Sequence, residues 1–533
     1  MTRRLTASLA IFLSSLALAA ERPNIVIIMA DDLGYSDLGC YGGEIKTPHL
    51  DRLALGGVRF TQFYNNAICT ATRASLMSGL YPRQTDKTSL RRCVTIAEVL
   101  KASGYRTMMA GKWHLRGHPR KRGFERYYGL LSGGCNHFNP GLKRPGEGPP
   151  GKKFHGDDQP FDLGDGIVKP FTPKRGFYST DAFTDAALRF LDQPTSKKKP
   201  FFLYLAYTVP HYPLHAPAAD IRRYRGKYMQ GWDVLRQARF KRLVSRKLIG
   251  ASWRLPPRDK NAPAWQTIKD KEAWDLKMAV YAAMVDRMDH NIGRVVAKLK
   301  KLGQFQNTLL VFLSDNGPSD ENRTTTPNLP PGPVESYRSV DLPWANLSNT
   351  PFRYFKRWNH QGGISTPMIV HWPHVIRRTN QICHRVSHIM DLMATYVEVA
   401  GAKYPREFNG HSVLPMEGKS LAPILREYST KDCLLIHKLT PRTLFWNQRA
   451  QWRAVRIGDW KLVSPDHTYQ YRPWRKGRKG RVIKPADHSL KPWELYNLAK
   501  DPTEINNLAS KHPQRVKSMA AIYAKWDKRV RTN

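Results

Sequence analysis

The segment at residues 24–30 (NIVIIMA) restricts the possible folds of this chain more than any other feature. It is a short apolar run without polar alternation, the pattern of a strand that is buried on both faces of a parallel sheet. Similar runs occur at residues 106–110, 201–207, 309–313 and 368–371. Helical stretches lie between several of them. We therefore expect an α/β domain with a mostly parallel central sheet flanked by helices.

Residues 275–302 carry the clearest helical pattern. Apolar residues recur there at intervals of three or four, namely at Met278, Tyr281, Val285, Met288, Ile292, Val295 and Leu299. Gly303 is expected to end this helix. The Gly- and Pro-rich residues 141–173 and 324–343 are expected to form loops.

The chain of 533 residues is too long for one simple core. We expect a large catalytic domain over residues 20–430 and a smaller C-terminal α+β subdomain over residues 431–533. Within the subdomain, residues 453–457 and 460–463 resemble short strands, and a helix is expected near residues 513–530. Residues 213–275 are basic and rich in tryptophan, and we expect them to form a helical insertion whose aromatic rings offer stacking faces for sugars.

The N-terminus has the pattern of a secretion signal over residues 1–19. Arg3 and Arg4 precede a short apolar run at residues 9–18, and residues 17–19 (ALA) offer a small-x-small cleavage site. The alternative, a transmembrane anchor, requires a longer apolar run, and no later segment reaches the length of a membrane span. We therefore expect an exported protein, periplasmic or secreted, with no stable membrane span.

Polar residues follow two of the expected strands. Asp31 and Asp32 come directly after the first strand, and Asp315 and Asn316 follow the strand at residues 309–313. In open parallel sheets, ligands gather at the carboxyl ends of the strands, so the two pairs are expected to meet. Their oxygen atoms suit calcium or magnesium, with one calcium ion favoured. Taken alone, the first pair is equally consistent with a helix cap.

The most specific motif is residues 69–79 (CTATRASLMSG). It resembles the signature by which type I sulfatases mark a cysteine for oxidation to formylglycine. The resemblance extends over nearly the whole chain and implies the alkaline-phosphatase-like fold. It also implies that a formylglycine-generating enzyme converts Cys69, and that the converted residue joins the metal ligands Asp31, Asp32, Asp315 and Asn316.

The same resemblance assigns further catalytic residues. Lys112 and His114 lie in residues 111–115 (GKWHL), which are similar to a family motif. By this resemblance Lys112 would hold the sulfate, and His114 would form a hydrogen bond with the formylglycine. Arg73 would position the hydrated aldehyde, His211 would approach the bridging oxygen, and Lys356 would be a second sulfate-binding lysine. The chain departs from many relatives at residue 361, where glutamine replaces an acidic residue. His215 is expected to be structural.

The net charge of +43 is the remaining strong signal. Such a charge attracts polyanions. No nucleic-acid-binding motif is present, so nucleic acid is not expected as a partner. A sulfated polysaccharide or an acidic surface is favoured, although a basic bias without any role in binding remains an alternative. The six cysteines leave disulfide connectivity open.

These features predict a sulfuric-ester hydrolase that releases inorganic sulfate from a sulfated carbohydrate, and from aryl sulfates in vitro. Two alternatives remain. One is a phosphoester or phosphonate monoester hydrolase of the same superfamily. The other is a catalytically dead protein that only binds polyanions, although the complete set of catalytic and metal-ligating residues argues against it.

Overall fold

The computed structural model describes residues 22–86, 88–152, 159–164, 167–168, 171–192, 199–428, 442–447, 452–465 and 492–532. The expected signal peptide at residues 1–19 and Cys433 lie outside the described residues. Of the other cysteines, Cys40, Cys69, Cys93 and Cys135 are buried thiols.

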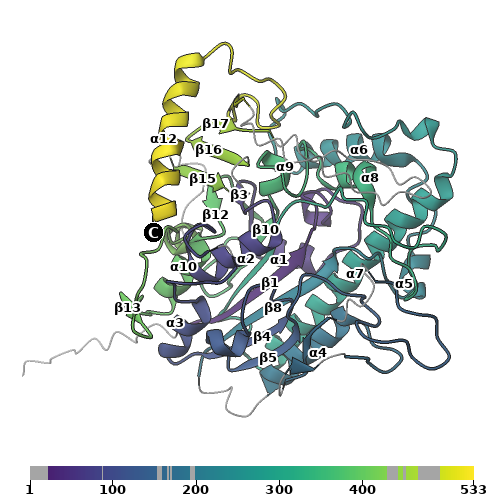
Figure 1. Ribbon diagram of the computed structural model, residues 1–533, viewed down its shortest axis with the longest axis horizontal. Helices are drawn as coiled ribbons and strands as arrows, with labels where there is room; N and C mark the ends of the chain where they lie inside the picture. Colours follow the sequence, from purple (N-terminus) through teal and green to yellow (C-terminus); the bar gives the residue numbers. More distant parts are fainter. Residues whose placement is uncertain are drawn as a thin grey trace, which may run out of the picture.

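A ten-stranded sheet forms the centre of the molecule (Figure 1). Its order is β11 (Gln381–Cys383), β2 (Val58–Phe60), β10 (Met368–His371), β9 (Thr308–Ser314), β1 (Asn24–Asp31), β8 (Phe201–Pro210), β4 (Arg106–Gly111), β5 (Arg126–Leu130), β6 (Phe161–Asp162) and β7 (Ile167–Val168). The strands from β9 to β5 run parallel, whereas β10 is antiparallel to both of its neighbours. The expected α/β class with a mostly parallel central sheet is thus confirmed.

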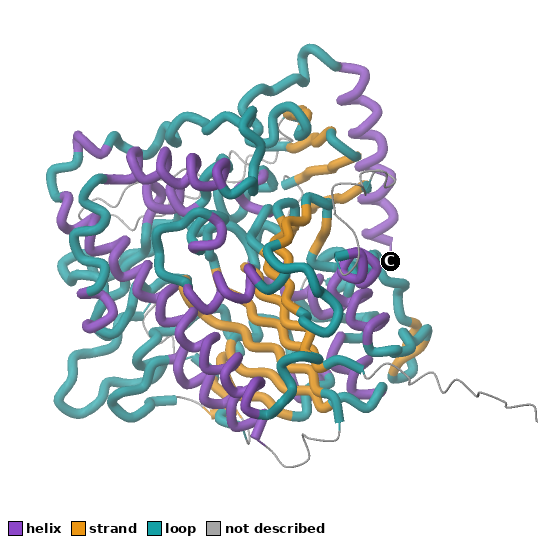
Figure 2. Tube along the Cα trace, turned by 180° about the vertical axis from the view of Figure 1, so that it is seen from behind, coloured by secondary structure: helices purple, strands orange, loops and turns teal. Residues whose placement is uncertain are grey.

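Helices cover both faces of this sheet (Figures 1 and 2). Val26 and Ile28 of β1 pack in a core shared with α1 (Pro48–Leu55), α4 (Ser179–Asp192) and α7 (Lys271–Lys301). Ile27 and Met29 point to the opposite core, which includes α2 (Cys69–Ser78), α3 (Ile96–Ala102) and α10 (Asp391–Val399). Every residue of β1 is buried, which explains why the strand shows no polar alternation.

Helix α7 matches the apolar spacing of the sequence and begins slightly earlier than expected. Asp270 caps its N-terminus, because the Asp270 side chain accepts a hydrogen bond from Ala273 N–H at 3.0 Å. Gly303 follows the helix with a φ of 68°, a conformation that favours glycine over other residues.

The segment at residues 213–275 is exposed in part and contributes several buried side chains to the core. It contains α5 (Ala218–Arg222), α6 (Gly231–Ser245) and the 3-10 helix η4 (Trp265–Thr267). Trp232 and Trp265 are buried and pack edge to face at 4.8 Å between ring centroids, with Trp344 of α8 (Asp341–Ser348) beside them. The expectation that these tryptophans offer stacking faces to sugars is therefore wrong for Trp232 and Trp265, whose rings stabilise the interior.

A second, antiparallel sheet follows. It consists of β15 (Thr443–Asn447), β16 (Arg453–Ile457), β17 (Trp460–Val463) and β18 (Glu494–Asn497). Helix α12 (Pro513–Thr532) packs on one face through Tyr523 and Trp526. On the other face, Trp446 donates from Nε1 to the backbone oxygen of Asn65 at 2.8 Å. The second sheet thus supports the segment that leads into α2.

Short elements complete the described chain. They are η1 (Gly39–Tyr41), β3 (Phe63–Tyr64), η2 (Pro119–Arg122), α9 (Gln361–Ile364), β12 (Ser387–His388), β13 (Glu407–Phe408), β14 (His411–Ser412) and α11 (Ala422–Glu427).

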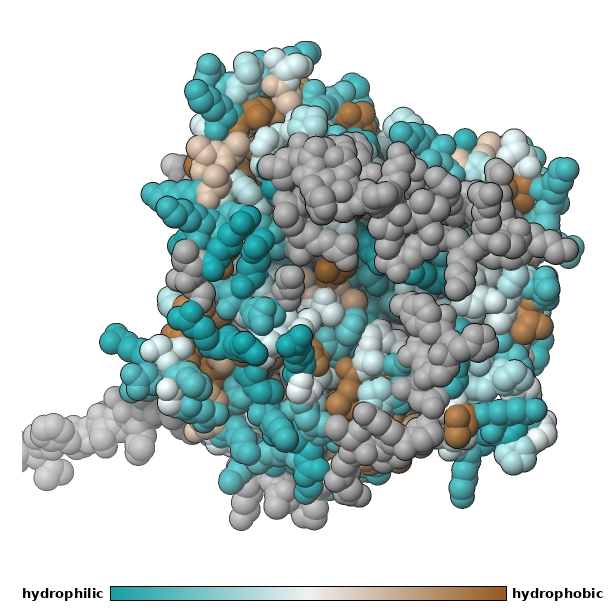
Figure 3. All heavy atoms as spheres, in the orientation of Figure 1, coloured by the Kyte–Doolittle hydropathy of each residue, from teal (hydrophilic) through white to brown (hydrophobic). Residues whose placement is uncertain are grey.

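The described surface in Figure 3 is largely hydrophilic, with hydrophobic residues scattered over it. Such scattered residues are normal for a protein surface and do not mark a binding face. Among the described residues, no helix combines the length and the apolar character that crossing a membrane requires.

Candidate active site

The four residues expected to hold a metal meet at the carboxyl ends of β1 and β9. The two strands are paired in register, with Ala30 opposite Ser314, so the residues that follow them are neighbours. Asp32 N–H donates to Asp315 Oδ1 at 3.2 Å, and Asn316 Nδ2 donates to Asp32 Oδ1 at 2.6 Å. Residues 284 positions apart in sequence are in direct contact, as expected for the edge of a parallel sheet.

Helix α2 places Cys69 and Arg73 at the same edge. Cys69 is the first residue of the helix, and Arg73 lies on the same face because it follows one turn later. Gly79 ends the helix in the left-handed conformation, with a φ of 70°. Cys69 Sγ lies 3.4 Å from His114 Nδ1, at the end of β4. The helix therefore presents the cysteine to a histidine from the loop that follows β4.

Three carboxylates and three cations form an ion-pair cluster around Cys69. The pairs are Asp31–Lys112 at 2.6 Å, Asp32–Lys356 at 2.8 Å and Asp315–Arg73 at 2.9 Å. All six side chains are buried, with at most 6% of any of them exposed. Every carboxylate has one cationic partner, so the six charges sum to zero.

The buried setting shifts the protonation equilibria of the cluster. Burial raises the pKa of Asp32 and Asp315, and Lys356 opposes the shift at Asp32. Burial alone would lower the pKa of Lys356, but the Asp32 carboxylate and other groups raise it well above its ordinary value. Burial also raises the pKa of the Cys69 thiol. Additional positive charge would favour the ionised carboxylates, so the cluster is suited to hold a cation.

The donor atoms also fit a hard divalent cation. Asp31 Oδ1 and Asn316 Oδ1 are buried and have no hydrogen-bond partner among the described residues. Ligand atoms of Asp31, Cys69 and Asp315 lie within 4.8 Å of one another. Buried oxygens without partners call for an explanation, and carboxylate and amide oxygens are the ligands that calcium and magnesium prefer.

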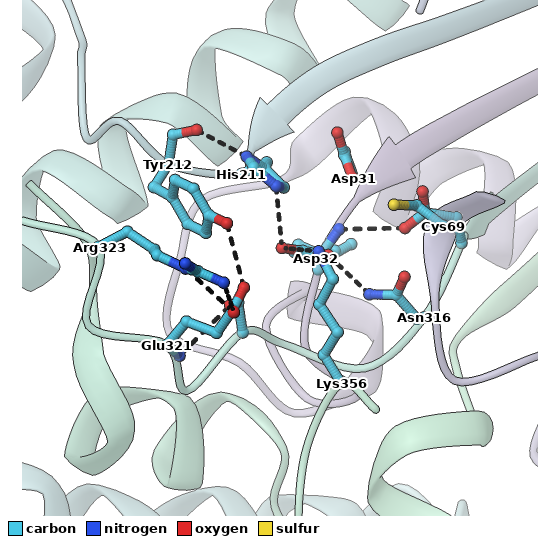
Figure 4. A network of polar contacts seen from close by, with 12 residues as sticks. Asp31, Asp32, Cys69, His211, Tyr212, Asn316, Glu321, Arg323 and Lys356 are labelled. Carbon is cyan, nitrogen blue, oxygen red and sulfur yellow. Dashed lines mark hydrogen bonds and ion pairs between the residues drawn. The ribbon is translucent and has the colours of Figure 1, made fainter. Parts of the chain in front are cut away.

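The two expected catalytic histidines lie beside the cluster: His114 contacts Cys69, and His211 faces Asp32 (Figure 4). His211 Nε2 is 3.7 Å from Asp32 Oδ2, and His211 Nδ1 is 2.6 Å from the backbone oxygen of Tyr212. His114 has a φ of 56° and Asp32 a φ of 64°, backbone strain of the kind that gathers at functional sites. The structure thus brings all ten predicted site residues together.

His215, in contrast, is structural, as expected. Its ring is buried, Nε2 lies 2.7 Å from the backbone oxygen of Ser336, and the Phe138 ring packs beside it at 5.5 Å. Burial lowers the pKa of His215 to about 3, so the ring is neutral at physiological pH. Gln361 is also buried, bonds to Tyr64 Oη at 2.9 Å and does not line the cavity described next.

A cavity of about 450 Å³ opens above Cys69, and His114, His211 and Lys356 also line it. Gly133, on the wall, lies so close to His114 that a Cβ there would be 2.5 Å from the imidazole ring. Glycine at this position leaves room for the histidine.

Four further lining residues, which we term the arginine cluster, are Tyr212, Glu321, Arg323 and Arg357. Sequence reasoning did not identify them, since they belong to loops without a recognisable motif. The available signal was adjacency in sequence: Tyr212 follows His211, and Arg357 follows Lys356. Neither adjacency predicts which way a side chain points.

Comparison with known proteins agrees with this geometry. The sulfatase family model matches residues 23–402. The chain is 34% identical to an arylsulfatase of Klebsiella aerogenes over 446 residues, covering 76% of this chain and 92% of the relative. It is 32% identical to an uncharacterized sulfatase of Schizosaccharomyces pombe, covering 93% of this chain and 91% of that protein.

A solved structure extends the similarity to three dimensions. The complex of Ps i-CgsB with k-i-k-neocarrahexaose superposes with a TM-score of 0.65 at 27% identity, covering 95% of this chain and 93% of the other. With the fold, the site residues and the family model in agreement, the chain belongs to the sulfatase family of the alkaline-phosphatase-like superfamily and is a sulfuric ester hydrolase.

Proposed function

We propose that this protein is an exported, formylglycine-dependent sulfatase that uses one calcium ion to remove sulfate from a sulfated carbohydrate. The observation that carries the proposal is the position of Cys69. Its Sγ lies on the floor of a cavity, 3.4 Å from His114 and within 4.8 Å of two carboxylates. An unmodified, buried thiol of raised pKa is a poor nucleophile, which is a reason for its conversion to an aldehyde.

The proposed reaction uses formylglycine, a calcium ion and the unmodified side chains of the site. Formylglycine, as its hydrate, supplies one hydroxyl to attack sulfur and a second whose deprotonation expels sulfate, and calcium supplies positive charge. Asp31, Asp32, Asp315 and Asn316 would hold the ion. Lys112 and Lys356 would bind sulfate oxygens and stabilise the charge that develops on them in the transition state. Arg73 would position the hydrate at residue 69.

Proton transfer would fall to the two histidines. His211 Nδ1 is anchored on the backbone oxygen of Tyr212, which leaves Nε2 directed toward Asp32, where it would donate a proton to the departing alcohol oxygen. His114, in contact with residue 69, would accept the proton of the second hydroxyl as sulfate leaves. Each histidine thus serves one half of the reaction.

Two observations support a carbohydrate substrate: the net positive charge of the chain and the ligand of a solved relative. The net charge of +43 favours capture of sulfated polymers. The solved relative Ps i-CgsB is in complex with k-i-k-neocarrahexaose. Capture of a polymer through charge is screened by salt, so its apparent affinity is expected to fall between low and physiological ionic strength. Turnover of a small aryl sulfate is expected to change little.

Mass spectrometry tests the modification. Protein produced together with a formylglycine-generating enzyme should yield a peptide in which residue 69 has lost sulfur and carries an aldehyde. The same preparation should cleave 4-nitrophenyl sulfate faster than 4-nitrophenyl phosphate. Full sulfatase activity with only the unmodified thiol would contradict the proposal, and preferred cleavage of the phosphate would favour a phosphoester hydrolase.

Chelation tests the metal. Exhaustive dialysis against EDTA should reduce turnover to about 1% or less, because the buried carboxylates then lack the cation that balances the bound sulfate. Calcium should restore activity. Undiminished activity in the metal-free protein, verified by elemental analysis, would rule out this role for the site.

A further inference from the structure

The cavity carries more positive charge than one sulfate ester requires. Among the described lining residues outside the ion-pair cluster, Lys152, Arg323 and Arg357 are cationic and only Glu321 is anionic. A sulfate monoester bears a single negative charge, and the buried pairs of the ion-pair cluster already balance one another. Of these residues, Glu321 and Arg323 lie on the side of His211 and Tyr212, away from Asp31 and Cys69 (Figure 4).

Glu321 organises the arginine cluster. Its Oε1 accepts from Arg323 Nε at 3.1 Å and pairs with Arg357 Nη2 at 2.6 Å, while its Oε2 accepts from Tyr212 Oη at 3.0 Å. Burial alone would raise the pKa of Glu321, but Arg357 and Arg323 lower it to about 2, so it is ionised at physiological pH. Both oxygens are engaged by protein donors. Arg357 also interacts with the buried Asp320, but burial and the neighbouring Glu321 raise the pKa of Asp320 well above its ordinary value, which disfavours a second negative charge there.

The backbone also holds this arrangement under strain. Arg357 has a φ of 80°, a conformation that is costly for a residue with a side chain, and its N–H donates to the backbone oxygen of Ala67 at 2.6 Å. Lys356, directly before it, faces Asp32. Because of this strained turn, the two consecutive cations point to different partners: Lys356 pairs with Asp32 of the ion-pair cluster, and Arg357 pairs with Glu321 of the arginine cluster.

From this geometry, and resting on the proposed sulfatase function, we propose that the arginine cluster binds a second anionic group of the substrate. That group is a carboxylate or a further sulfate on the saccharide that carries the scissile ester. Guanidinium groups form paired hydrogen bonds with both anions, and Arg323 and Arg357 present two such groups. Tyr212 and His211 are adjacent, so the bridging oxygen and the second anion would lie on neighbouring parts of one sugar or of two linked sugars.

Calorimetric binding tests this subsite without turnover. Calcium-loaded protein with unmodified Cys69 would be titrated with three ligands: a neutral hexose monosulfate, a hexose disulfate and a hexuronate monosulfate. At least one dianionic ligand should bind about ten-fold or more tightly than the neutral monosulfate, the effect expected of a charge-assisted hydrogen bond. Which of the two dianions is preferred identifies the anion.

Variants then locate the effect. Arg323→Gln and Arg357→Gln should each reduce the preference for the dianion to less than about three-fold. Arg222→Gln removes the same charge from the exposed surface of α5 and should leave the preference unchanged. If a glutamine variant does not unfold cooperatively, the comparison of the three ligands on the unaltered protein decides the proposal.

Two results would overturn it: equal affinity for all three ligands, or a preference that survives in both folded glutamine variants. Turnover of 4-nitrophenyl sulfate by the matured protein is measured separately. Its absence would contradict the proposed function, whereas normal turnover with equal ligand affinities would contradict the subsite alone.

Discussion

In the ion-pair cluster three carboxylates face three cations, whereas in the arginine cluster two guanidinium groups share one carboxylate. Apart from Lys356, the first set lies at strand ends and on one helix, and all of its side chains are almost fully buried. The second lies on loops, with 14% of Arg323 and 24% of Arg357 exposed. Regular elements thus carry most of the ion-pair cluster, whereas loops carry the arginine cluster, and one turn supplies a cation to each.

The largest effect should come from the centre of the ion-pair cluster. Cys69→Ala removes the residue that we propose as the precursor of the nucleophile, and sulfate release from any substrate should fall by about 10⁴-fold or more. Cys93→Ala is the matched control, since Cys93 is as buried as Cys69, with 7% of each exposed. Its turnover should change by less than about three-fold. Comparable losses in both variants would mean that folding, and not chemistry, is affected.

A smaller loss should follow from breaking one ion pair. Lys356→Met leaves Asp32 without its ammonium partner and removes a donor to the sulfate, so kcat should fall by about 10²- to 10³-fold. The loss should be equal for substrates with one and with two anionic groups, in contrast to variants of Arg357. Lys101→Met, on the exposed surface of α3, should be neutral. A kcat within ten-fold of the unaltered protein would remove Lys356 from the catalytic set.

The ionisation of Glu321 in the arginine cluster should make the free energy of unfolding depend on pH. Its pKa is about 2 in the folded protein against 4.5 ordinarily, so ionised Glu321 stabilises the fold by about 3 kcal/mol above pH 5. This contribution is lost as the pH falls toward 2, with about 2 kcal/mol gone by pH 3. Urea unfolding at pH 7 and pH 3 should show that dependence, and Glu321→Gln should show less of it. An unchanged difference between the two pH values in the variant would contradict the pairing.

The smallest effect should arise from the cavity wall. In Gly133→Ala the new Cβ would lie 2.5 Å from the His114 ring and must displace it, lowering kcat by about ten-fold. Gly134→Ala is the control, because its Cβ would lie 3.5 Å from His211, an ordinary contact. Equal kcat in both variants would show that the exact position of His114 has little influence.

The central strands and the meeting of the two polar pairs were predictable because both depend on local signals, whereas Arg73, Lys112 and Lys356 were assigned by the resemblance to sulfatases and their ion pairs were not predicted. Residues 24–30, 201–207 and 309–313 are buried strands in the structure, and the polar pairs that follow the first and the third of them meet. The antiparallel direction of β10 was not predictable, since an apolar run carries no sign of direction. The buried Trp232 was misinterpreted for a related reason: composition does not tell whether an aromatic ring lies in a core or on a surface.

Strand β1 lies between β8 and β9, so the sheet edge that carries the site forms only after both of these later strands have been synthesised. Cys69 leaves the ribosome early, but the strand that brings Asp315 to it comes much later in the chain. At roughly 5–20 residues per second, tens of seconds separate the two events. During that interval the site cannot close over Cys69. The proposed modifying enzyme, which must reach this buried residue, would therefore act while the chain is still being made or during the proposed export.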